Sequence, residues 1–343
     1  MGLRVAILGA SGYAGGEVVR LIDGHPSFTV AYLGAHSQAG RPLGAAHPQL
    51  SGGERLLASN DPEAVPAVDV AFLALPHGAS ALTGAALARR GIKVVDIGSD
   101  FRMDTAARYQ EAYGTPHPLP DELPAWVYGL PELFRARLVG AERVAAPGCY
   151  PTSALLALAP LLRQGLIAEQ GIVINALSGV SGAGRTLRED LLFGAVAESV
   201  RAYGVTTHRH RPEIEMGLEL ACGRPLRLLF TPHLMPMQRG MLSTCSAPLA
   251  REATRADLLG ALREAYAGSP FVSVIDEPPQ TRWVVGSNRA VLTAYVDART
   301  QSAVVLSVID NLLKGAAGQA VQCANLMCGL DETEGLPWNG IMP

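Results

Sequence analysis

Short apolar runs alternate with helix-like stretches through the first half of the chain. The runs predict strands over Arg4–Leu8, Phe28–Leu33, Val68–Leu75, Lys93–Ile97 and Arg143–Ala146. Near-continuous apolar runs of this length are typical of parallel strands that are buried on both faces. Helical patterns cover Glu17–Ile22 and the stretch that ends at Arg90, whereas residues 104–142 are rich in proline, glycine and charge and predict an irregular segment. The alternation of strand and helix predicts a parallel sheet with crossover helices.

The second half has a different pattern, in which strands follow one another with few helices between them. Helices are predicted over Thr152–Arg163 and Arg255–Tyr266, and a last helix from Asp310 to about Cys328. The predicted strands are Gly171–Leu177, Leu226–Phe230, Met241–Ala247, Phe271–Ile275, Ala290–Val296 and Ala303–Val308. Successive strands of this kind favour a mostly antiparallel sheet. The predicted fold class is α/β, with a parallel-sheet domain first and an α+β domain after it.

Composition narrows the class of protein. The chain has 343 residues, of which 48% are hydrophobic and 17% charged, as in globular proteins of ordinary size. A net charge of −3 gives no general attraction to nucleic acid or to an anionic membrane, so neither is an expected partner. The five cysteines are odd in number and widely spaced, with no CxxC pair, which argues against a disulfide framework and a zinc site. No apolar run is long enough to span a membrane, and the N-terminus runs straight into a strand, so we expect a cytoplasmic protein without a metal.

A glycine-rich turn follows the first strand. It is Gly9-Ala-Ser-Gly12-Tyr-Ala-Gly15, between a strand and a helix. Glycines in this context permit a tight turn and the close approach of a pyrophosphate to the helix N-terminus, as in Rossmann-type domains. The alternative is a tight turn without a ligand. The residues assigned to cofactor binding are Gly9, Ser11, Gly12, Tyr13, Ala14 and Gly15.

The segment after the second strand indicates which dinucleotide binds. NAD-preferring domains usually have an acidic residue there, which bonds the ribose hydroxyls. Residues 34–41 contain none, and Ser37 and Arg41 suit a 2′-phosphate instead. NADP is therefore expected rather than NAD, although His36 or Arg41 could equally be an ordinary residue of a solvated loop.

Cys149 is the candidate nucleophile. It follows Pro147-Gly148 and precedes Pro151, which is expected at the first position of a helix. A thiol just before a helix faces backbone N–H groups and the positive end of the helix dipole, and both favour the thiolate. The alternative is a small buried hydrophobic residue, the commonest role of a cysteine.

Anion-binding candidates follow two other strands. Arg102 comes shortly after the strand that ends at Ile97, and a guanidinium matches the geometry of phosphate or carboxylate. The loop Ser178–Arg185, which includes Ser181 and Gly182, is rich in glycine and serine and can present backbone N–H groups to an anion. A surface arginine and a flexible connection are the alternatives.

A dense cationic patch, His208-Arg-His210-Arg211, precedes a proline and a helix. It suits an acidic substrate, and its histidines suit acid/base chemistry. On an extended segment His208 and His210 would face the same side. Without Cys149, this patch would be interpreted as a solvated loop.

These motifs together resemble the N-acetyl-γ-glutamyl-phosphate reductase family, which is related to the aspartate-semialdehyde dehydrogenases. The resemblance covers essentially the whole chain. Its most specific part is Ala146–Thr152, beside the glycine-rich turn, Leu75–Ser80, Ser178–Arg185, His208–Glu215 and Asp310–Gln319. Ser153 and Cys323 depart from the family pattern.

The resemblance implies that NADPH reduces an acyl phosphate, N-acetyl-glutamyl 5-phosphate, to the semialdehyde in arginine biosynthesis. Cys149 would form a thioester, with His210 as acid/base and His208 as its partner toward the substrate, an order that stays open. The other implied substrate residues are Arg102, which would hold phosphate, Ser181 and Arg211, and the other implied cofactor residues are Gly182 and Asn311.

The resemblance also implies a domain organisation. Residues 1–148 and 311–343 would form the NADP-binding domain, and residues 149–310 the catalytic and oligomerisation domain of a dimer or tetramer.

Three alternatives remain. The first is the homologous reductase of lysine biosynthesis, which reduces an aminoadipyl phosphate held on a small acidic carrier protein, because one methylene changes binding by only about 1–3 kcal/mol. The second is a non-catalytic NADP-binding sensor, which the presence of Cys149 and the histidines disfavours. The third is aspartate-semialdehyde dehydrogenase activity, which the sequence around Cys149 and the histidines disfavours.

Overall fold

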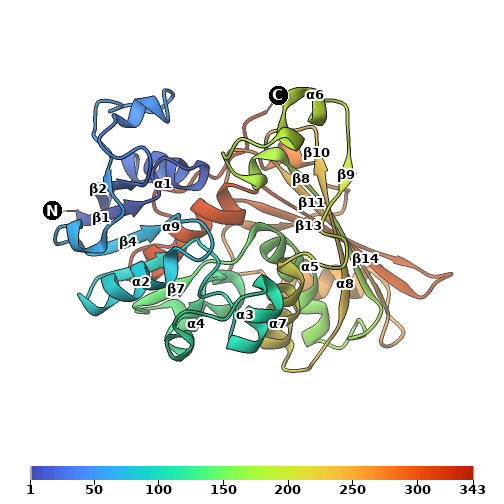
Figure 1. Ribbon diagram of the computed structural model, residues 1–343. Helices are drawn as coiled ribbons and strands as arrows, with labels where there is room; N and C mark the ends of the chain where they lie inside the picture. Colours follow the sequence, from blue (N-terminus) through green and yellow to red (C-terminus); the bar gives the residue numbers. More distant parts are fainter. Residues whose placement is uncertain (1, 343) are drawn as a thin grey trace. The chain divides into compact units, whose positions relative to one another are not determined.

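The structure is a computed structural model and describes residues 2–342 of the chain (Figure 1). The chain forms two compact units. The first comprises the residues up to Gln110, then Thr115–Pro147 and Ala316–Leu336. The second comprises Glu111–Gly114, Gly148–Gly315 and the residues from Pro337 onward. Each unit has its own seven-stranded sheet.

The sheet of the first unit has the order β3-β2-β1-β4-β5-β7-β6, and the pairings among the described residues are all parallel. Its strands are β1 (Leu3–Leu8), β2 (Phe28–Ala35), β3 (Ala58–Ser59), β4 (Val70–Leu73), β5 (Lys93–Asp96), β6 (Val127–Tyr128) and β7 (Arg143–Ala145). The residues of β4 are completely buried, as a near-continuous apolar run predicts. The predicted parallel sheet is confirmed.

The helices of this half are α1 (Tyr13–Asp23), α2 (Ser80–Arg89), α3 (Ala106–Tyr113), α4 (Pro131–Leu138) and α9 (Gly318–Met327). The last turn of α3 belongs to the second unit. The prediction of an irregular segment over 104–142 is wrong in part, because α3, α4 and β6 lie within it. Both helices are only eight residues long, with one buried residue in α3 and three in α4, so their apolar periodicity is weak in the sequence.

The sheet of the second unit is mixed, with the order β12-β13-β14-β11-β8-β10-β9. Its strands are β8 (Ile172–Gly179), β9 (Arg201–Ala202), β10 (Leu228–Met235), β11 (Met241–Pro248), β12 (Val272–Val274), β13 (Ala290–Asp297) and β14 (Ser302–Ile309). The pairings of β8 with β10 and of β12 with β13 are parallel, and the other four are antiparallel, so the prediction of a mostly antiparallel sheet is confirmed.

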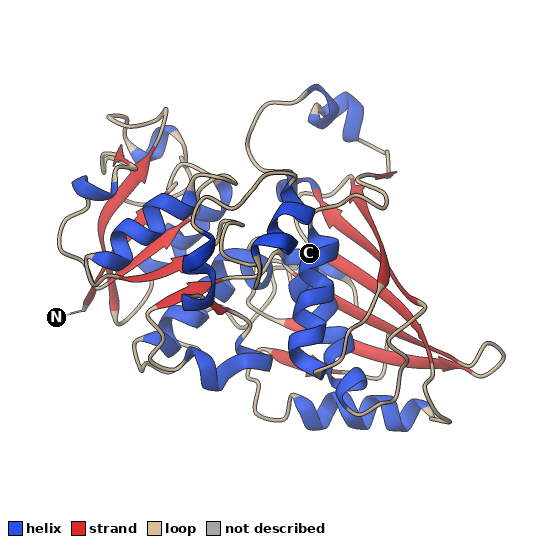
Figure 2. Cartoon of the chain, turned by 60° about the horizontal axis from the view of Figure 1, so that its bottom comes forward, coloured by secondary structure: helices blue, strands red, loops and turns tan. Residues whose placement is uncertain are grey.

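Helices pack on one face of this sheet, which Figure 2 shows in blue against red strands. They are α5 (Cys149–Arg163), α7 (His210–Cys222) and α8 (Arg255–Ala265), with α5 packed on β11 and β14 and α8 on β13. Residues alternate along the strands between buried and partly exposed positions, so the other face of the sheet is half-open to solvent.

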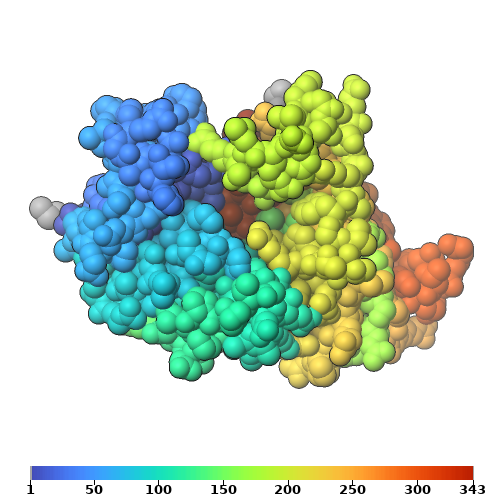
Figure 3. Space-filling model, in the orientation of Figure 1, coloured from blue at the N-terminus to red at the C-terminus, as the bar shows by residue number. Residues whose placement is uncertain are grey.

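A long excursion between β8 and α7 contains only short elements, among them α6 (Phe193–Val196) and three-residue or four-residue 3₁₀ turns. Figure 3 shows this stretch in yellow-green at the surface of the second unit, where Leu187 and Phe193 are almost fully exposed.

Near the end of the chain, the helix predicted from Asp310 begins at Leu313, and its first turn is not α-helical. A π-helical turn over Leu313–Ala317 precedes α9.

Candidate active site

Cys149 is the first residue of α5, and its side chain is half-buried. Gly148 is the N-cap, in an extended conformation, and no side chain caps the helix. The prediction that Pro151 begins the helix is wrong, because the helix begins at Cys149 and Pro151 is the third residue. A proline fits there equally well, since the first N–H groups of a helix have no acceptor within it. The thiol therefore lies at the positive end of the helix dipole, closer than the sequence predicted.

A buried carboxylate connects this helix start to α7. Glu213 lies in the first turn of α7 and has no exposed surface. Its Oε1 accepts a hydrogen bond of 2.9 Å from the backbone N–H of Gly148. Charge-assisted bonds in a dry environment are stronger than neutral ones. Glu213 thus fixes the residue before the thiol relative to the first turn of α7, where His210 lies.

His208 and His210 lie together at the start of α7, with ring centroids 4.9 Å apart. The predicted extended segment is wrong, because Arg209 has helical backbone angles and His210 is already the first residue of α7. The backbone N–H of His210 donates to Nδ1 of His208 over 3.1 Å. Burial, and then the charge of Arg209, lowers the pKa of His208 to about 4. His208 is therefore neutral at pH 7, and its proton lies on Nε2, where it can donate to a ligand.

Two tyrosines, Tyr150 and Tyr203, pack against the histidines. The hydroxyl groups of Tyr150 and Tyr203 are hydrogen-bonded over 2.9 Å. Burial raises the pKa of Tyr203 to about 12 and raises the pKa of Tyr150 further, so both hydroxyl groups stay protonated. The Tyr150 ring packs edge-on against both histidines, with centroid distances of 5.7 Å to His208 and 5.8 Å to His210. This packing restricts the orientation of the imidazole rings.

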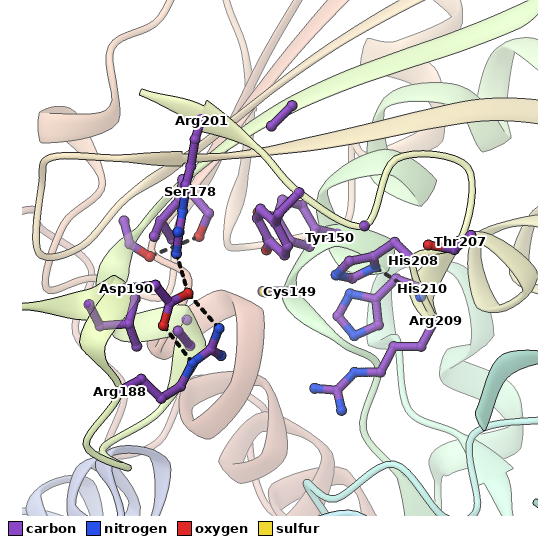
Figure 4. A pocket seen from close by; sticks show the side chains of 18 residues that line it. Cys149, Tyr150, Ser178, Arg188, Asp190, Arg201, Thr207, His208, Arg209 and His210 are labelled. Carbon is purple, nitrogen blue, oxygen red and sulfur yellow. Dashed lines mark hydrogen bonds and ion pairs between the residues drawn. The ribbon is translucent and has the colours of Figure 1, made fainter. Parts of the chain in front are cut away.

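Cys149 and the two histidines line one pocket of about 530 Å³, which lies within the second unit. This volume is in the range of small-molecule sites. Figure 4 shows Cys149 near the centre, with the histidines on one side and a charged group on the other. The charged group consists of Arg188, Asp190 and Arg201, and Arg209 lies on the histidine side. The pocket is thus cationic and suits an anionic ligand.

The predicted glycine- and serine-rich loop also reaches this pocket. Ser178 and Gly182 line it. The side chain of Asn311 fixes Ser181 of this loop: its Nδ2 donates a hydrogen bond to Oγ of Ser181 over 2.9 Å. Oδ1 of Asn311 accepts a hydrogen bond from the N–H of Gly240, also over 2.9 Å. Asn311 thereby orients the loop. Gly315, in the π-helical turn, packs on Cys149, since a Cβ at this position would lie 2.6 Å from the Cβ of Cys149.

The two arginines of the cationic patch have different surroundings. Arg211 forms ion pairs with Glu111 at 2.5 Å and with Glu215 at 3.4 Å, and it is not among the residues that line the pocket. Arg209 lines the pocket instead. The sequence motif does not distinguish Arg209 from Arg211, and the prediction chose Arg211. In the structure Arg209 is the N-cap of α7 and Arg211 is the second residue of this helix, so the two side chains have different neighbours.

The glycine-rich turn of the first unit has the geometry that a dinucleotide needs. Gly9 has φ +83°, and a Cβ on it would lie 2.3 Å from the carbonyl oxygen of Ala74. A Cβ on Gly15 would lie 2.2 Å from the carbonyl oxygen of Gly9. No side chain caps α1, and its first turn holds no carboxylate, so its positive end is available to an anion. Ser11, Gly12, Tyr13 and Ala14 complete this turn.

The remaining predicted residues also lie in the first unit. Ser37 and Arg41 follow β2, and Nη1 of Arg41 donates to Oε1 of Gln38 over 2.9 Å. Arg102 is buried, and its Nη2 donates to the carbonyl oxygen of Ile97 over 2.8 Å. This bond fixes the side chain close to the end of β5.

Two general findings concern the part of the chain that the structure describes. No helix in residues 2–342 has the length and apolar character needed to cross a bilayer. In the same residues, histidine, cysteine and carboxylate side chains do not gather in groups of three that would hold a metal ion.

Sequence reasoning missed most of the charged and aromatic lining. The missed residues are Tyr150, Arg188, Asp190, Arg201, Tyr203 and Arg209. The signal that could have found some of them is the density of charge in residues 185–201, a stretch without apolar periodicity that lies between the anion-binding loop and the histidines.

The fold and these features define the class of the protein. A parallel-sheet unit with a dinucleotide-type turn, joined to a unit whose cationic pocket contains a cysteine and two histidines, is the arrangement of an oxidoreductase with a nicotinamide cofactor. Two family models match the chain: the NAD binding domain of semialdehyde dehydrogenase over residues 4–141, and the dimerisation domain of semialdehyde dehydrogenase over residues 149–311.

Curated relatives narrow the class further. The N-acetyl-gamma-glutamyl-phosphate reductase of Moorella thermoacetica is 45% identical over 345 residues, which cover 99% of this chain and 100% of that protein. The protein of the same name from Paenarthrobacter aurescens is 47% identical over 349 residues, covering 100% of both chains. The chain therefore belongs to the N-acetyl-gamma-glutamyl-phosphate reductase family, within the wider semialdehyde dehydrogenase family. The predicted family is confirmed.

Solved structures agree on the fold. Aspartate semialdehyde dehydrogenase II of Vibrio cholerae, complexed with ASA, has a TM-score of 0.72 at 17% identity, and the match covers 96% of this chain and 99% of that chain. The aspartate semialdehyde dehydrogenase of Candida albicans with NADP has a TM-score of 0.69 at 16% identity and the same coverage. The predicted α/β fold class is confirmed, and an NAD(P)-binding domain is present.

Proposed function

We propose that this protein reduces N-acetyl-L-glutamyl 5-phosphate to N-acetyl-L-glutamate 5-semialdehyde, with release of phosphate, as a step of arginine biosynthesis. The observation that carries the proposal is the position of Cys149 at the start of α5, in one cationic pocket with His208 and His210. The names of the full-length relatives supply the substrate. The substrate is strongly anionic, as a pocket with three arginines and one aspartate requires.

In the proposed reaction, the Cys149 thiolate attacks the carbonyl carbon of the acyl phosphate. The bond from this carbon to the phosphate oxygen breaks, phosphate leaves with the electron pair, and a thioester forms at Cys149. NADPH, when bound, supplies the hydride that reduces the acyl group. The carbon–sulfur bond then breaks, which releases the aldehyde and restores the thiolate. One hydride is consumed for each aldehyde formed, and one proton is taken up by the departing phosphate.

The histidines have different roles in this scheme. His210 moves the proton to and from the oxygen of the tetrahedral species, because it lines the pocket together with Cys149 and an imidazole can both accept and donate a proton. Because the pKa of His208 is about 4, almost none of it is in the imidazolium form at pH 7, and it cannot serve as the general acid. Its Nε2–H instead donates a hydrogen bond to the substrate, while its Nδ1 accepts from the His210 backbone. This supports the assignment of His210 as the acid/base and His208 as its partner.

The residues of the first unit fit a dinucleotide with a 2′-phosphate. The glycine-rich turn leaves the positive end of α1 to the pyrophosphate. After β2, Ser37 and Arg41 supply a hydroxyl and a guanidinium where an acidic residue would repel the phosphate. We therefore propose NADPH as the cofactor. The check is the ratio of kcat/KM for NADPH to that for NADH, which we expect to fall about 10-fold or more in Arg41→Ala.

The half-open face of the mixed sheet supports a homo-oligomer. Apolar side chains lie there at partly exposed positions, namely Val173, Leu177, Leu229, Val304 and Leu306. Exposed apolar side chains on one face of a sheet favour an interaction site, and the matching family model is described as a dimerisation domain. We propose that this face binds a second copy. Leu229, which is 60% exposed, is the position to test: Leu229→Asp is expected to halve the mass measured by light scattering. An unchanged mass would contradict this interface.

The test of the function is an assay in the reverse direction. The purified protein receives N-acetyl-L-glutamate semialdehyde, phosphate and NADP, with the aminoadipate homologue of the aldehyde in parallel. We expect NADPH formation that depends on phosphate, prefers the glutamate compound and falls on the order of 10⁴-fold in Cys149→Ser. Turnover of the homologue alone would assign the protein to lysine biosynthesis. No turnover of either compound, despite NADP binding, would contradict the proposal and favour a sensor.

The proposed compartment is the cytoplasm. The five cysteines are all free of disulfide bonds, as a reducing compartment requires.

A further inference from the structure

We propose that Arg188 and Arg201, held together by Asp190, form a subsite for the α-carboxylate of the substrate. The inference rests on the proposed function for the identity of the substrate and adds how the end of the substrate away from the reacting carbon is recognised. Neither the sequence motifs nor the relatives assign a role to these residues.

The geometry of the three side chains is well defined. Arg188 makes a two-pronged contact with Asp190, with Nε to Oδ1 at 2.9 Å and Nη2 to Oδ2 at 2.6 Å. Nη2 of Arg201 donates to the same Oδ2 over 2.5 Å. These bonds to Arg188 and then to Arg201 lower the pKa of Asp190, so it stays ionised. One carboxylate therefore aligns two guanidinium groups.

The cluster keeps a net positive charge and unused donors. Two guanidinium groups share a single carboxylate, which leaves one positive charge. Among the described residues, Asp190 is the only hydrogen-bond acceptor of Arg201, so its Nε and Nη1 groups have no acceptor in the chain. A guanidinium with an open edge matches the two oxygens of a carboxylate.

Stability does not account for this arrangement. The three side chains are between 35% and 52% exposed. Ion pairs at such exposure contribute little to folding. They also lie on an excursion that has few buried residues, so a cluster of aligned charges there is more readily explained by a ligand than by packing.

The position in the pocket separates this subsite from the reacting centre. Figure 4 shows the cluster on one side of Cys149 and the histidines with Arg209 on the other. The carbonyl group under attack needs a proton donor, so it belongs on the histidine side. The carboxylate of an N-acetylated amino acid lies at the other end of its carbon chain, which directs it to Arg188 and Arg201.

The decisive experiment is the kinetics of Arg201→Ala in the reverse assay. We expect the KM for N-acetyl-L-glutamate semialdehyde to rise about 10- to 100-fold, while the KM for phosphate changes less than about 2-fold. The analogue without the carboxylate, 4-acetamidobutanal, is expected to react equally in the variant and the unchanged protein. Arg299→Ala, which removes another exposed arginine paired with an aspartate, is the matched control and leaves both KM values unchanged.

A binding measurement keeps the inference testable without turnover. N-acetyl-L-norvaline has the carboxylate and the carbon chain of the substrate but no reactive group, and its affinity is measured by calorimetry. We expect binding to weaken about 10-fold or more in Arg201→Ala and less in Arg201→Lys, at unchanged melting temperature. If the unchanged protein turns over neither aldehyde, the proposed function fails, and this binding alone decides the subsite.

Two results would overturn the inference. A raised KM for phosphate with an unchanged KM for the aldehyde would show that the cluster binds the phosphoryl group. Unchanged values for both substrates, with or without a lower melting temperature, would reduce the cluster to a surface ion-pair network.

Discussion

The candidate cofactor site and the candidate catalytic pocket are built in opposite ways. In the first unit, the turn from Gly9 to Gly15 is contiguous in the chain and offers mainly backbone groups, which glycine leaves accessible. In the second unit, the pocket collects side chains from the start of α5, the end of β8, the excursion with β9, and the start of α7. A site made of backbone groups, such as this turn, needs small residues that leave those groups accessible. A site made of side chains, such as this pocket, needs neighbours distant in sequence that orient each side chain.

If the catalytic pocket depends on side chains, the largest loss of activity is expected on replacing His210, its proposed acid/base residue. His210→Asn is expected to lower kcat about 10²- to 10⁴-fold with little change in cofactor affinity, because the proton relay is lost while the first unit is untouched. His208→Asn should mainly raise the KM for the aldehyde. The measurements are steady-state kinetics and NADPH titration, with His36→Asn, an exposed histidine of the first unit, as the control. A loss of equal size in the two pocket variants would mean that the roles of the histidines are not separate.

A methyl group at Gly15 tests the backbone side of the comparison. Its Cβ would lie 2.2 Å from the Gly9 carbonyl oxygen, so Gly15→Ala is expected to lower the free energy of unfolding by about 2–3 kcal/mol. At Gly12 the nearest atom would be 3.4 Å away, so Gly12→Ala should leave stability unchanged and weaken dinucleotide binding. Urea unfolding and fluorescence titration measure the two effects. Equal stabilities would contradict the role of close packing at Gly15.

Glu213 tests whether the pocket depends on orientation. Glu213→Ala leaves the buried N–H of Gly148 without its acceptor, so the free energy of unfolding should fall by about 2 kcal/mol and kcat about 10-fold. Glu213→Gln keeps an acceptor oxygen and should restore most of both. If Gln is as damaging as Ala, the charge and not the hydrogen bond is what matters.

The smallest expected effect is the pH dependence of His208. Its folded pKa of about 4 lies below the unfolded value of 6.5, so the unfolded chain binds the proton more readily between these values. The free energy of unfolding should therefore fall, by about 1–2 kcal/mol, as the pH drops from about 7 to about 5. His208→Asn removes this contribution and flattens the curve measured by urea unfolding. A steeper curve in the variant would contradict the lowered pKa.

The same contrast explains what the sequence could predict. The sequence predicts strands β1, β4 and β5 because most of their residues are buried on both faces, which leaves a continuous apolar run. Strand β2 is predicted by its apolar run as well, although its first half is partly exposed. Helices α3 and α4 were missed because they are short, and tertiary packing stabilises them more than their own periodicity does. The π-helical turn before α9 is not predicted, because the sequence indicates only one helix from Asp310 onward.

Within the pocket, the sequence predicted Cys149, His208, His210 and Gly182 because each lies in a compact motif. It missed Arg201 because nothing near that residue marks it. Arg201 gains its position only when β9 pairs with β10, which sets it opposite Leu234, another residue of the pocket lining. Pairing between strands so far apart in the chain cannot be inferred from local pattern.

The contact between Gly315 and Cys149 has a consequence for the order in which the protein is made. Cys149, the proposed nucleophile, is synthesised before the middle of the chain, whereas Gly315, against which its Cβ packs, follows near the C-terminal end. The growing polypeptide therefore cannot complete the surroundings of its reactive sulfur until synthesis is nearly finished. A residue larger than glycine at position 315 would push against the Cβ of Cys149 and change the position of its thiol. A codon near the end of the coding sequence is therefore constrained by a residue encoded before its middle.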